Sequence, residues 1–407
     1  MLVQKLSIGV ALLCSLAAPT TAQELPKWLV EAKAREAKLG DLTEVSSTDG
    51  WLKTKVPGSV ASKVTLDDEA YQIGIQLDGS VQVSCEVLKG TKDIARLMSR
   101  TSEITFEALQ KLHGTIEFKA IEAADAGALE GIPFMTQQWI YRANLNGEKK
   151  VGGLKQFVAS LDQAVVYCAH DELGFAKTFD TVSKALTRHL TIQGEQVPKT
   201  HFRDVSVMSL DDTRVGVATT TMAKDADGDT KVVTVSAMVI QTAPGKLVTQ
   251  DKYRVEWVRP DGSLINALES KASNGELSAE VALKRTDGRW KVSGSLAGKE
   301  IEAELPSAPR SFLEMARDRR QLMAQANPEG AKTEAMAWMS PDFTRLVSVR
   351  ATLLKPVGST GFGSREELSG LVMEAVLDKS TGTLISAKMP IAARQLSVDR
   401  VFLQGEF

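Results

Sequence analysis

Residues 203–305 alternate apolar and polar side chains along almost their whole length. Tyr253, Val255 and Trp257, for example, alternate with charged neighbours, and turn-forming pairs such as Asn274-Gly275 separate the alternating runs. Side chains of a strand point to its two faces in turn, and Asn-Gly or Asp-Gly pairs supply the positive φ that a tight hairpin needs. The stretch therefore predicts an antiparallel meander with one apolar and one polar face.

The rest of the chain mixes strand-like and helix-like patterns, so the predicted fold class is α+β with antiparallel sheets. A polar connector that contains Pro198 separates an N-terminal α/β sandwich from the meander. The predicted parts are a signal peptide at 1–22, a helical arm at 23–44, an α+β sandwich domain at 45–195, and an antiparallel meander domain at 200–407 with a helical insertion at 310–340.

The N-terminus has the pattern of a secretory signal peptide. Lys5 precedes an apolar run at 6–18, and the small residues Thr20, Thr21 and Ala22 offer a cleavage position. The apolar run is too short to span a membrane, and no later segment approaches the ~20 apolar residues of a transmembrane helix. We therefore expect an exported protein, periplasmic or secreted, without a transmembrane segment.

The charge balance argues against one class of partner. The chain holds 49 Lys and Arg against 51 Asp and Glu, which gives a net charge of −2. Because there is no basic surplus to neutralise phosphates, no nucleic-acid partner is expected.

Two cysteines remain once the signal peptide is removed, Cys85 and Cys168, and both lie in strand-like runs of the predicted sandwich domain. In an oxidising compartment such a pair commonly forms a disulfide, and the alternative is two buried free thiols. We predict the disulfide.

The predicted sandwich domain contains two helices. The first is expected to begin with Thr91 as its N-cap and to end at His113-Gly114, and the second to begin with Asp171 as its cap. The strands are predicted at 51–56, 70–77, 81–88, 115–121, 134–145, 151–161 and 164–169.

The end of this domain resembles a known family. Residues Val165-Val-Tyr-Cys-Ala-His170, followed by a helix that contains Phe175 and Phe179, are similar to the closing strand and helix of the PsbP-like α/β/α sandwich. The resemblance rests on the order of elements. Members of that group act mostly as small accessory or binding proteins, so the resemblance implies a non-enzymatic role.

Beyond the meander, Ser311 and Glu314 have the spacing of a capping box and predict the start of a helix. A second helix is predicted from Asn327-Pro328 to about residue 339. The glycine-rich run 358–363 lacks the lysine of a phosphate-binding loop and predicts a flexible loop, able to act as a lid. Strand patterns return at 343–354, 368–377, 384–390 and 396–403.

This order of meander, helices and returning strands resembles the LolA/LolB type of periplasmic carriers. In those proteins helices cover the mouth of a curved sheet with an apolar interior. The resemblance implies a β-meander half-barrel with inserted helices, and it transfers no binding-site residue to this chain.

No residue pattern in the chain names a reaction. Asp225-x-Asp227-x-Asp229 resembles the start of a calcium loop, but the glycine and the final glutamate of such a loop are out of place, so a hairpin turn is expected. His170-Asp171-Glu172 is the densest group of possible metal ligands, and Asp171 is better explained as a helix cap. We therefore predict no catalytic residue, no metal site and no cofactor.

The expected function is that of a non-enzymatic binding or carrier protein, which holds an apolar ligand or an extended peptide on the curved sheet. The predicted ligand-binding residues are Met238, Tyr253, Val255 and Trp257, for which ordinary core packing is the alternative. The expected partner is a hydrophobic small molecule or lipid, or another envelope protein.

Two other classes stay open. One is an envelope assembly factor whose sheet edges pair with a partner chain, and the other is an enzyme whose site the sequence does not reveal. A carrier requires a roomy apolar cavity, an assembly factor requires an exposed patch or edge, and an enzyme requires ionisable groups that converge in a cleft.

Overall fold

The computed structural model describes residues 26–406, apart from 68–69, 78–80, 91–92, 194–198, 341 and 369. The predicted signal peptide and the predicted cap Thr91 lie outside the described residues. The chain forms two compact units, Met1–Gln196 with Val239–Thr249, and Val197–Met238 with Gln250–Phe407. Both units are built on antiparallel sheets, and the predicted α+β class is confirmed.

A seven-stranded sheet forms the centre of the N-terminal unit, in the order β3-β4-β5-β9-β8-β7-β6. A second, three-stranded sheet has the order β1-β2-β10. The strands are β1 (Leu42–Ser46), β2 (Leu52–Pro57), β3 (Ser59–Asp67), β4 (Ala70–Gln76), β5 (Gln82–Lys89), β6 (Thr115–Leu129), β7 (Ile132–Leu145), β8 (Glu148–Ser160), β9 (Ala164–His170) and β10 (Thr191–Ile192).

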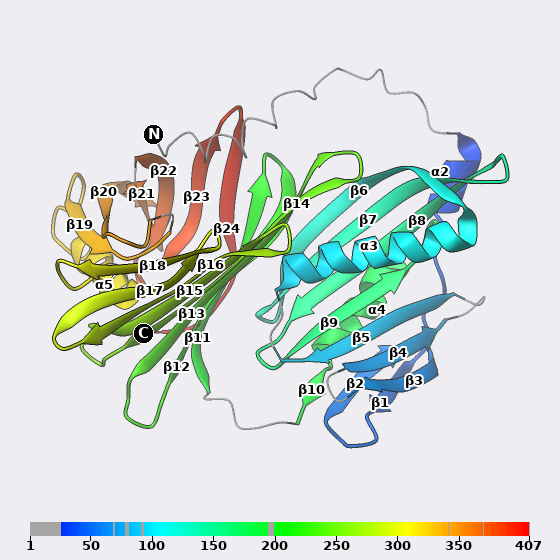
Figure 1. The fold of residues 1–407 in the computed structure, drawn as a ribbon, viewed down its shortest axis with the longest axis horizontal. Helices are drawn as coiled ribbons and strands as arrows, with labels where there is room; N and C mark the ends of the chain where they lie inside the picture. The colour runs from blue at the N-terminus through cyan, green and yellow to red at the C-terminus, as the bar shows by residue number, and fades with distance from the viewer. Residues whose placement is uncertain are drawn as a thin grey trace. The chain divides into compact units, whose positions relative to one another are not determined.

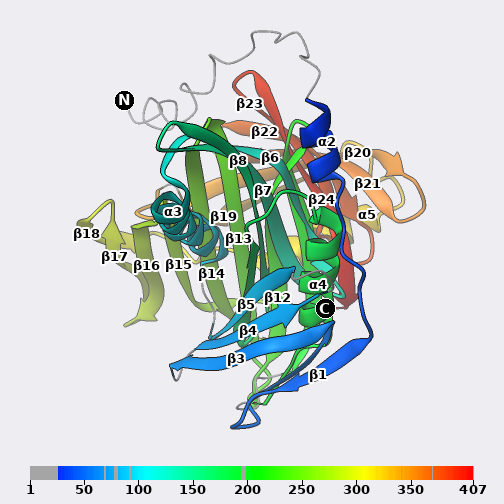
Figure 2. The same cartoon turned by 90° about the vertical axis from the view of Figure 1, so that its right-hand side faces the viewer.

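Helices α3 (Ile94–His113) and α4 (Ala176–Arg188) cover opposite faces of the seven-stranded sheet (Figure 2). The α3 residues Phe106 and Leu109 pack in one core cluster with Leu154 of β8. The α4 residues pack in another cluster with Phe157 of the same strand. Because residues 154 and 157 point to opposite sides of the strand, the unit is an α/β/α sandwich, as predicted.

The start of α4 differs from the prediction. Asp171 does not cap the helix, because the chain first turns through Gly174 and Phe175, which both have positive φ. Instead, Glu36 accepts hydrogen bonds from the backbone N–H groups of Lys177 (3.0 Å) and Thr178 (2.7 Å). A carboxylate from the segment after α2 (Lys27–Lys33) thus satisfies the free amides of the helix N-terminus.

Cys85 and Cys168 lie directly opposite each other on β5 and β9. Their Cα atoms are 4.0 Å apart and their sulfur atoms are bonded. The disulfide joins positions separated by 83 residues in the chain, within the core on the α4 side of the sheet.

A fourteen-stranded sheet forms most of the C-terminal unit, and most of its strands lie side by side in Figure 1. Residues 239–249 of this sheet group with the N-terminal unit. The sheet has the order β18-β17-β16-β15-β14-β13-β12-β11-β24-β23-β22-β21-β20-β19. The first eight strands are β11 (Thr200–Leu210), β12 (Thr213–Lys224), β13 (Thr230–Ala243), β14 (Lys246–Val258), β15 (Leu264–Ser273), β16 (Glu276–Thr286), β17 (Arg289–Leu296) and β18 (Lys299–Leu305). The others are β19 (Lys332–Ala337), β20 (Val347–Val357), β21 (Gly361–Leu368), β22 (Leu371–Asp378), β23 (Leu384–Ile391) and β24 (Arg394–Gly405).

Helix α5 (Phe312–Met323) lies against both halves of this sheet. Leu313 belongs to a core cluster with residues of β11–β18, whereas Met323 belongs to a cluster with Leu353 and Phe362 of β20 and β21. A sheet whose two ends pack on one helix must curve around it, which gives the predicted half-barrel. The predicted capping box of Ser311 and Glu314 is present.

The prediction of a second helix in the insertion, at 328–339, is wrong. Residues Lys332–Ala337 form β19 and pair with β20. Pairing with β20, the next strand along the chain, overrides the local helical pattern, and Trp338 after β19 is buried with its Nε1 donating to the Phe343 carbonyl oxygen (2.9 Å).

Two other predicted segments are turns. The glycine-rich run 358–363 is a tight turn and the start of β21, so the predicted mobile lid is wrong. At 225–229, the Asp225 carboxylate accepts hydrogen bonds from the backbone N–H groups of Asp227 and Asp229, both at 3.0 Å. This is the predicted hairpin turn.

A buried lysine lies on the α4 side of the N-terminal sheet. Lys155 is 4% exposed and donates to the carbonyl oxygen of Glu172. Its cross-strand neighbour His170 is also buried, and its Nδ1 is 2.9 Å from the Gln82 carbonyl oxygen. Burial lowers the pKa of Lys155 to about 8, although the carboxylates of Glu172 and Asp171 oppose this shift.

We expect stability to rise between about pH 8 and pH 10.5, because the unfolded chain still holds the Lys155 proton there and the folded chain does not. Over this whole pH range the free energy of unfolding should rise by about 3 kcal/mol. Urea unfolding of the wild type and of Lys155→Met across this range tests it. The variant should lack this part of the rise, and identical pH profiles would contradict the assignment. Burial also raises the pKa of Tyr141 to about 12. This shift changes the stability only above about pH 10, and it does so in the wild type and the variant alike.

Replacing both Cys85 and Cys168 with Ala should lower the free energy of unfolding by about 2–5 kcal/mol, because the unfolded chain gains the freedom of a long loop. Denaturant unfolding with and without a reducing agent measures this. Reduction should destabilise the wild type by a similar amount and leave the variant unchanged. An unchanged wild type under full reduction would show that the bridge is not part of the folded protein.

Candidate functional site

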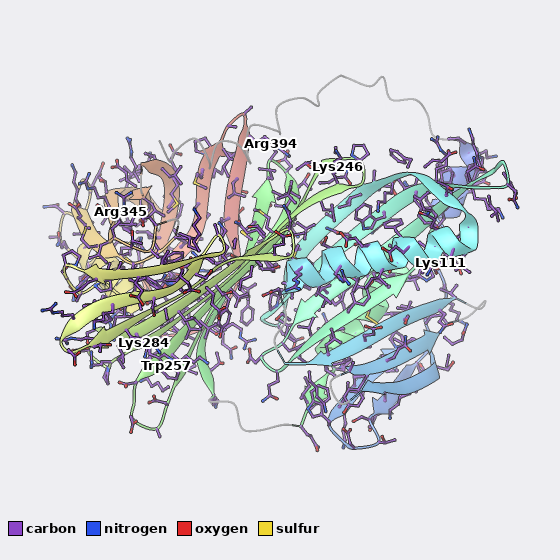
Figure 3. All side chains as sticks on the ribbon, in the orientation of Figure 1. Lys111, Lys246, Trp257, Lys284, Arg345 and Arg394 are labelled. Atoms are coloured by element: carbon purple, nitrogen blue, oxygen red, sulfur yellow. A yellow bond between two sulfur atoms is a disulfide. The ribbon has the colours of Figure 1, made fainter. Side chains whose placement is uncertain are left out.

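The structure does not bring the four predicted ligand-binding residues to one surface. Arg254, Glu256 and Val258 of β14 share the side that faces α5, because Glu256 accepts a 2.7 Å hydrogen bond from the backbone N–H of Phe312. Alternation then directs Tyr253, Val255 and Trp257 to the opposite side (Figure 3 labels Trp257).

Met238 lies on the other side from these three residues. It is six positions from Val232 in an unbroken register with β12, so the two side chains share a side. Val232 belongs to the core cluster that contains Leu313 of α5. Val255 is 7% exposed, and the other predicted residues are half-buried. A ligand role for the four residues stays a prediction.

The side of the sheet that faces α5 contains a buried ionic cluster. Arg254 donates to Glu256 (2.7 Å) and to Glu269 (2.8 Å), and the ammonium group of Lys252 is 3.1 Å from Glu269. Burial opposes ionisation of Glu269, but Lys252 and Arg254 outweigh burial and lower its pKa. The Arg254 guanidinium also lies 5.4 Å from the ring centre of Trp338.

A second ionic cluster lies where β11 meets β24. Arg400 is within 2.9 Å of Asp204 and 2.7 Å of Asp378, and it donates to the Thr383 hydroxyl at 2.6 Å. Its side chain is only 8% exposed. A third pair joins Arg319 of α5 to the buried Glu366.

These clusters change the expected character of the concave face. Buried charged side chains lie on this face among the packed apolar clusters. The ions are paired with one another, which is the arrangement that makes their burial tolerable. The concave face thus differs from the continuous apolar surface that the sequence predicts for a carrier.

A pocket of about 640 Å³ opens at the end of the sheet where the β14–β15 and β16–β17 turns meet the N-terminus of α5. Its volume lies in the range of small-molecule sites. It is lined by Arg259, Ser263, Leu264, Arg285, Gly288, Arg289, Trp290, Glu304, Leu305, Pro306, Ser307, Ala308, Pro309, Arg310 and Glu314. We call this the arginine pocket.

Two of the four pocket arginines are paired with the two pocket glutamates. Arg289 lies 3.3 Å from Glu304, and Arg310 lies 2.9 Å from Glu314. Arg310 also bonds to Asp318 in the next turn of α5. The charges of these two arginines are therefore balanced within the protein.

The other two arginines donate only to neutral groups. Arg259 donates through Nη1 to the Ser263 hydroxyl (3.2 Å) and the Leu264 carbonyl oxygen (3.3 Å). Arg285 donates through Nε to the Gly288 carbonyl oxygen (3.4 Å). Within the described ranges no carboxylate forms an ion pair with either side chain. Asp261, an exposed residue of the adjoining turn, lowers the net charge near Arg259.

The floor of the pocket is apolar. Leu264, Trp290 and Leu305 are all less than 8% exposed and belong to the core cluster beneath α5. The pocket therefore combines two arginines that form no ion pair with the described residues and an apolar base, which suits an anion that has an apolar part.

The sequence reasoning missed the arginine pocket. Its residues come from two turns and from the segment after β18, and each arginine in the sequence reads as an ordinary charge beside a turn. The available signal was the repeated placement of arginine beside a turn, at Arg259, Arg285 and Arg289. That signal indicates a site only once the turns are known to lie at one end of the sheet.

No group of three His, Cys, Asp or Glu side chains in the described part of the chain converges as a metal site would require. None of the described helices is long and apolar enough to cross a membrane.

Comparison with known proteins identifies no family. No protein-family model matches the chain, and no curated protein matches it. Among solved structures, a β-barrel-like protein of Domain of Unknown Function DUF1849 from Brucella abortus is 14% identical, covers 51% of this chain and 99% of its own, and has a TM-score of 0.39.

Two Pseudomonas aeruginosa proteins match more weakly. One, of unknown function, is 10% identical over 39% of this chain and 99% of its own, and a DUF1089 family protein is 15% identical over 49% and 95%. Both have a TM-score of 0.20. Similarity at these levels supports no functional assignment. None of the three is described as PsbP-like or of the LolA/LolB type, so those resemblances stay predictions.

Glu269→Gln should lower the free energy of unfolding by about 3–5 kcal/mol, because it leaves Lys252 and Arg254 without their shared buried carboxylate. Glu280→Gln removes an exposed carboxylate from the adjacent strand, on the opposite side of the sheet. It should change stability by less than about 0.5 kcal/mol. Equal effects of the two substitutions in urea unfolding would contradict a stabilising role for the cluster.

Proposed function

We propose that this protein is a non-enzymatic binding or carrier module that holds an anionic small molecule in the arginine pocket. The observation that carries the proposal is the pair Arg259 and Arg285, whose charges no ion pair in the described residues balances, above the buried apolar floor. Both pocket glutamates are already paired with arginines. Such a lining favours binding of an anion over acid–base chemistry, which needs a group free to exchange a proton.

The class of function is the one expected from the sequence, a binding or carrier protein, but the ligand is now an anion. The sequence led us to expect an apolar ligand, or an extended peptide, across the concave face. Because buried ion pairs occupy that face, the pocket at its end is the better candidate. A hydrophobic molecule or lipid remains a suitable ligand if it has an acidic head group, with its apolar part over Trp290 and Leu305.

We also propose that the protein works outside the cytoplasm. Two observations support this: the signal-peptide pattern at residues 1–22 and the bonded pair Cys85 and Cys168. Disulfides of this kind persist in oxidising compartments. A periplasmic or secreted module would meet small molecules that enter from the surroundings.

The probe for the pocket is 2-naphthoate, which has one carboxylate and a flat apolar body. Arg285→Gln should weaken its binding at least about tenfold, the effect of losing one charge-assisted hydrogen bond. The matched control is Lys284→Gln, which removes the same charge from the neighbouring exposed residue outside the pocket lining (Figure 3). Isothermal titration calorimetry at low salt measures both.

Unchanged binding in Arg285→Gln, or an equal loss in Lys284→Gln, would refute the pocket as the site. No binding of 2-naphthoate, of a dicarboxylate or of an alkyl phosphate would refute the proposed function. Native mass spectrometry of residues 23–407 purified from the periplasm adds an independent test, because a bound acidic molecule released on denaturation would identify the ligand class.

A further inference from the structure

The free N–H donors of the pocket arginines indicate how many negative charges a well-matched ligand carries. A guanidinium group has five N–H donors and binds a carboxylate or phosphate best through two parallel bonds. In Arg285 only Nε has a partner among the described residues, the carbonyl oxygen of Gly288. Both terminal nitrogens, Nη1 and Nη2, are therefore available to an incoming anion.

Arg259 has a comparable set of free donors. Its Nη1 is held by Ser263 and Leu264, which fixes the position of the group. Its Nη2 and Nε have no hydrogen-bond partner within the described part of the chain. Nη2 and Nε form one edge of the guanidinium plane, which is a second site for two parallel bonds.

The charges of the remaining two arginines are already paired with carboxylates of the protein. Arg310 uses both terminal nitrogens, Nη1 on Glu314 and Nη2 on Asp318. Nη1 of Arg289 lies 3.4 and 3.3 Å from the two carboxylate oxygens of Glu304. The pocket thus has two guanidinium groups that no ion pair balances.

We infer that the natural ligand of the arginine pocket is a dianion, with two carboxylates or one phosphate monoester group shared between Arg259 and Arg285. This inference rests on the proposed function and specifies its ligand. Asp261 offsets part of the charge of Arg259, so the inference depends on the free donors. A single carboxylate can occupy the free donors of only one guanidinium group, whereas a dianion can bond to both and gains the second set of charge-assisted hydrogen bonds.

The test compares ligands that differ by one negative charge and one methyl group. Succinate, glutarate and adipate are each titrated against their monomethyl esters, and methyl phosphate against dimethyl phosphate, at about pH 8, where a phosphate monoester carries close to two charges. Calorimetry at low salt uses the full mature chain. We expect at least one dianion to bind at least about tenfold more tightly than its monoanionic partner. The dicarboxylate and phosphate pairs separate the two sources of charge.

Arg259→Gln and Arg285→Gln should each abolish this preference, while Lys284→Gln should keep it. If 2-naphthoate binds in an Arg285-dependent way and no dianion binds more tightly than its monoanionic partner, the dianion inference is wrong and the proposed function stands. A preference that survives in Arg259→Gln would also overturn the inference, because Arg259 would then not share the ligand. If no anion binds, both proposals fail.

Discussion

The pairing of β11 with β24 is the interaction on which the C-terminal unit depends. It joins the first strand of one meander to the last strand of another, so that strands at both ends of a long chain segment share one sheet. The buried Arg400 reinforces this junction by contacting Asp204 of β11 and Asp378 of β22. Once the junction forms, the sheet has its two free edges at β18 and β19, which are consecutive in the chain and joined through α5.

Helix α5 explains why the sheet curves and why its interior is charged. Its apolar residues contact core clusters from both halves of the sheet, and its N-terminal amide at Phe312 bonds to the buried Glu256. The hydrogen bond to Glu256 and the ion pair between Arg319 and Glu366 hold the helix in one orientation, because such polar contacts depend on direction more than apolar contacts do. They also occupy space that a carrier of purely apolar molecules would leave open.

The arginine pocket follows from the same geometry. Antiparallel strands place alternate turns at one end of the sheet, and here the β14–β15 and β16–β17 turns meet the segment that leads into α5. An arginine beside a turn is well solvated, so its charge takes little from the free energy of folding. Arg259 and Arg285 form no ion pair with the described residues, so they bring positive charge to this opening, although the whole chain has a net charge of only −2.

The sequence by itself determined the elements whose signals are local. Period-two alternation predicts the strands of the meander, the Ser311–Glu314 spacing predicts the start of α5, and Asp225 predicts its turn.

Tertiary structure decided what depends on partners outside the local sequence pattern. Residues 332–337 became a strand because β20 was available to pair with them, and Glu36 rather than Asp171 capped α4. Met238 was separated from Tyr253 because alternation fixes the two sides of a strand but not the side that α5 covers. Arg259 and Arg285 line one pocket only because folding brings their two turns together.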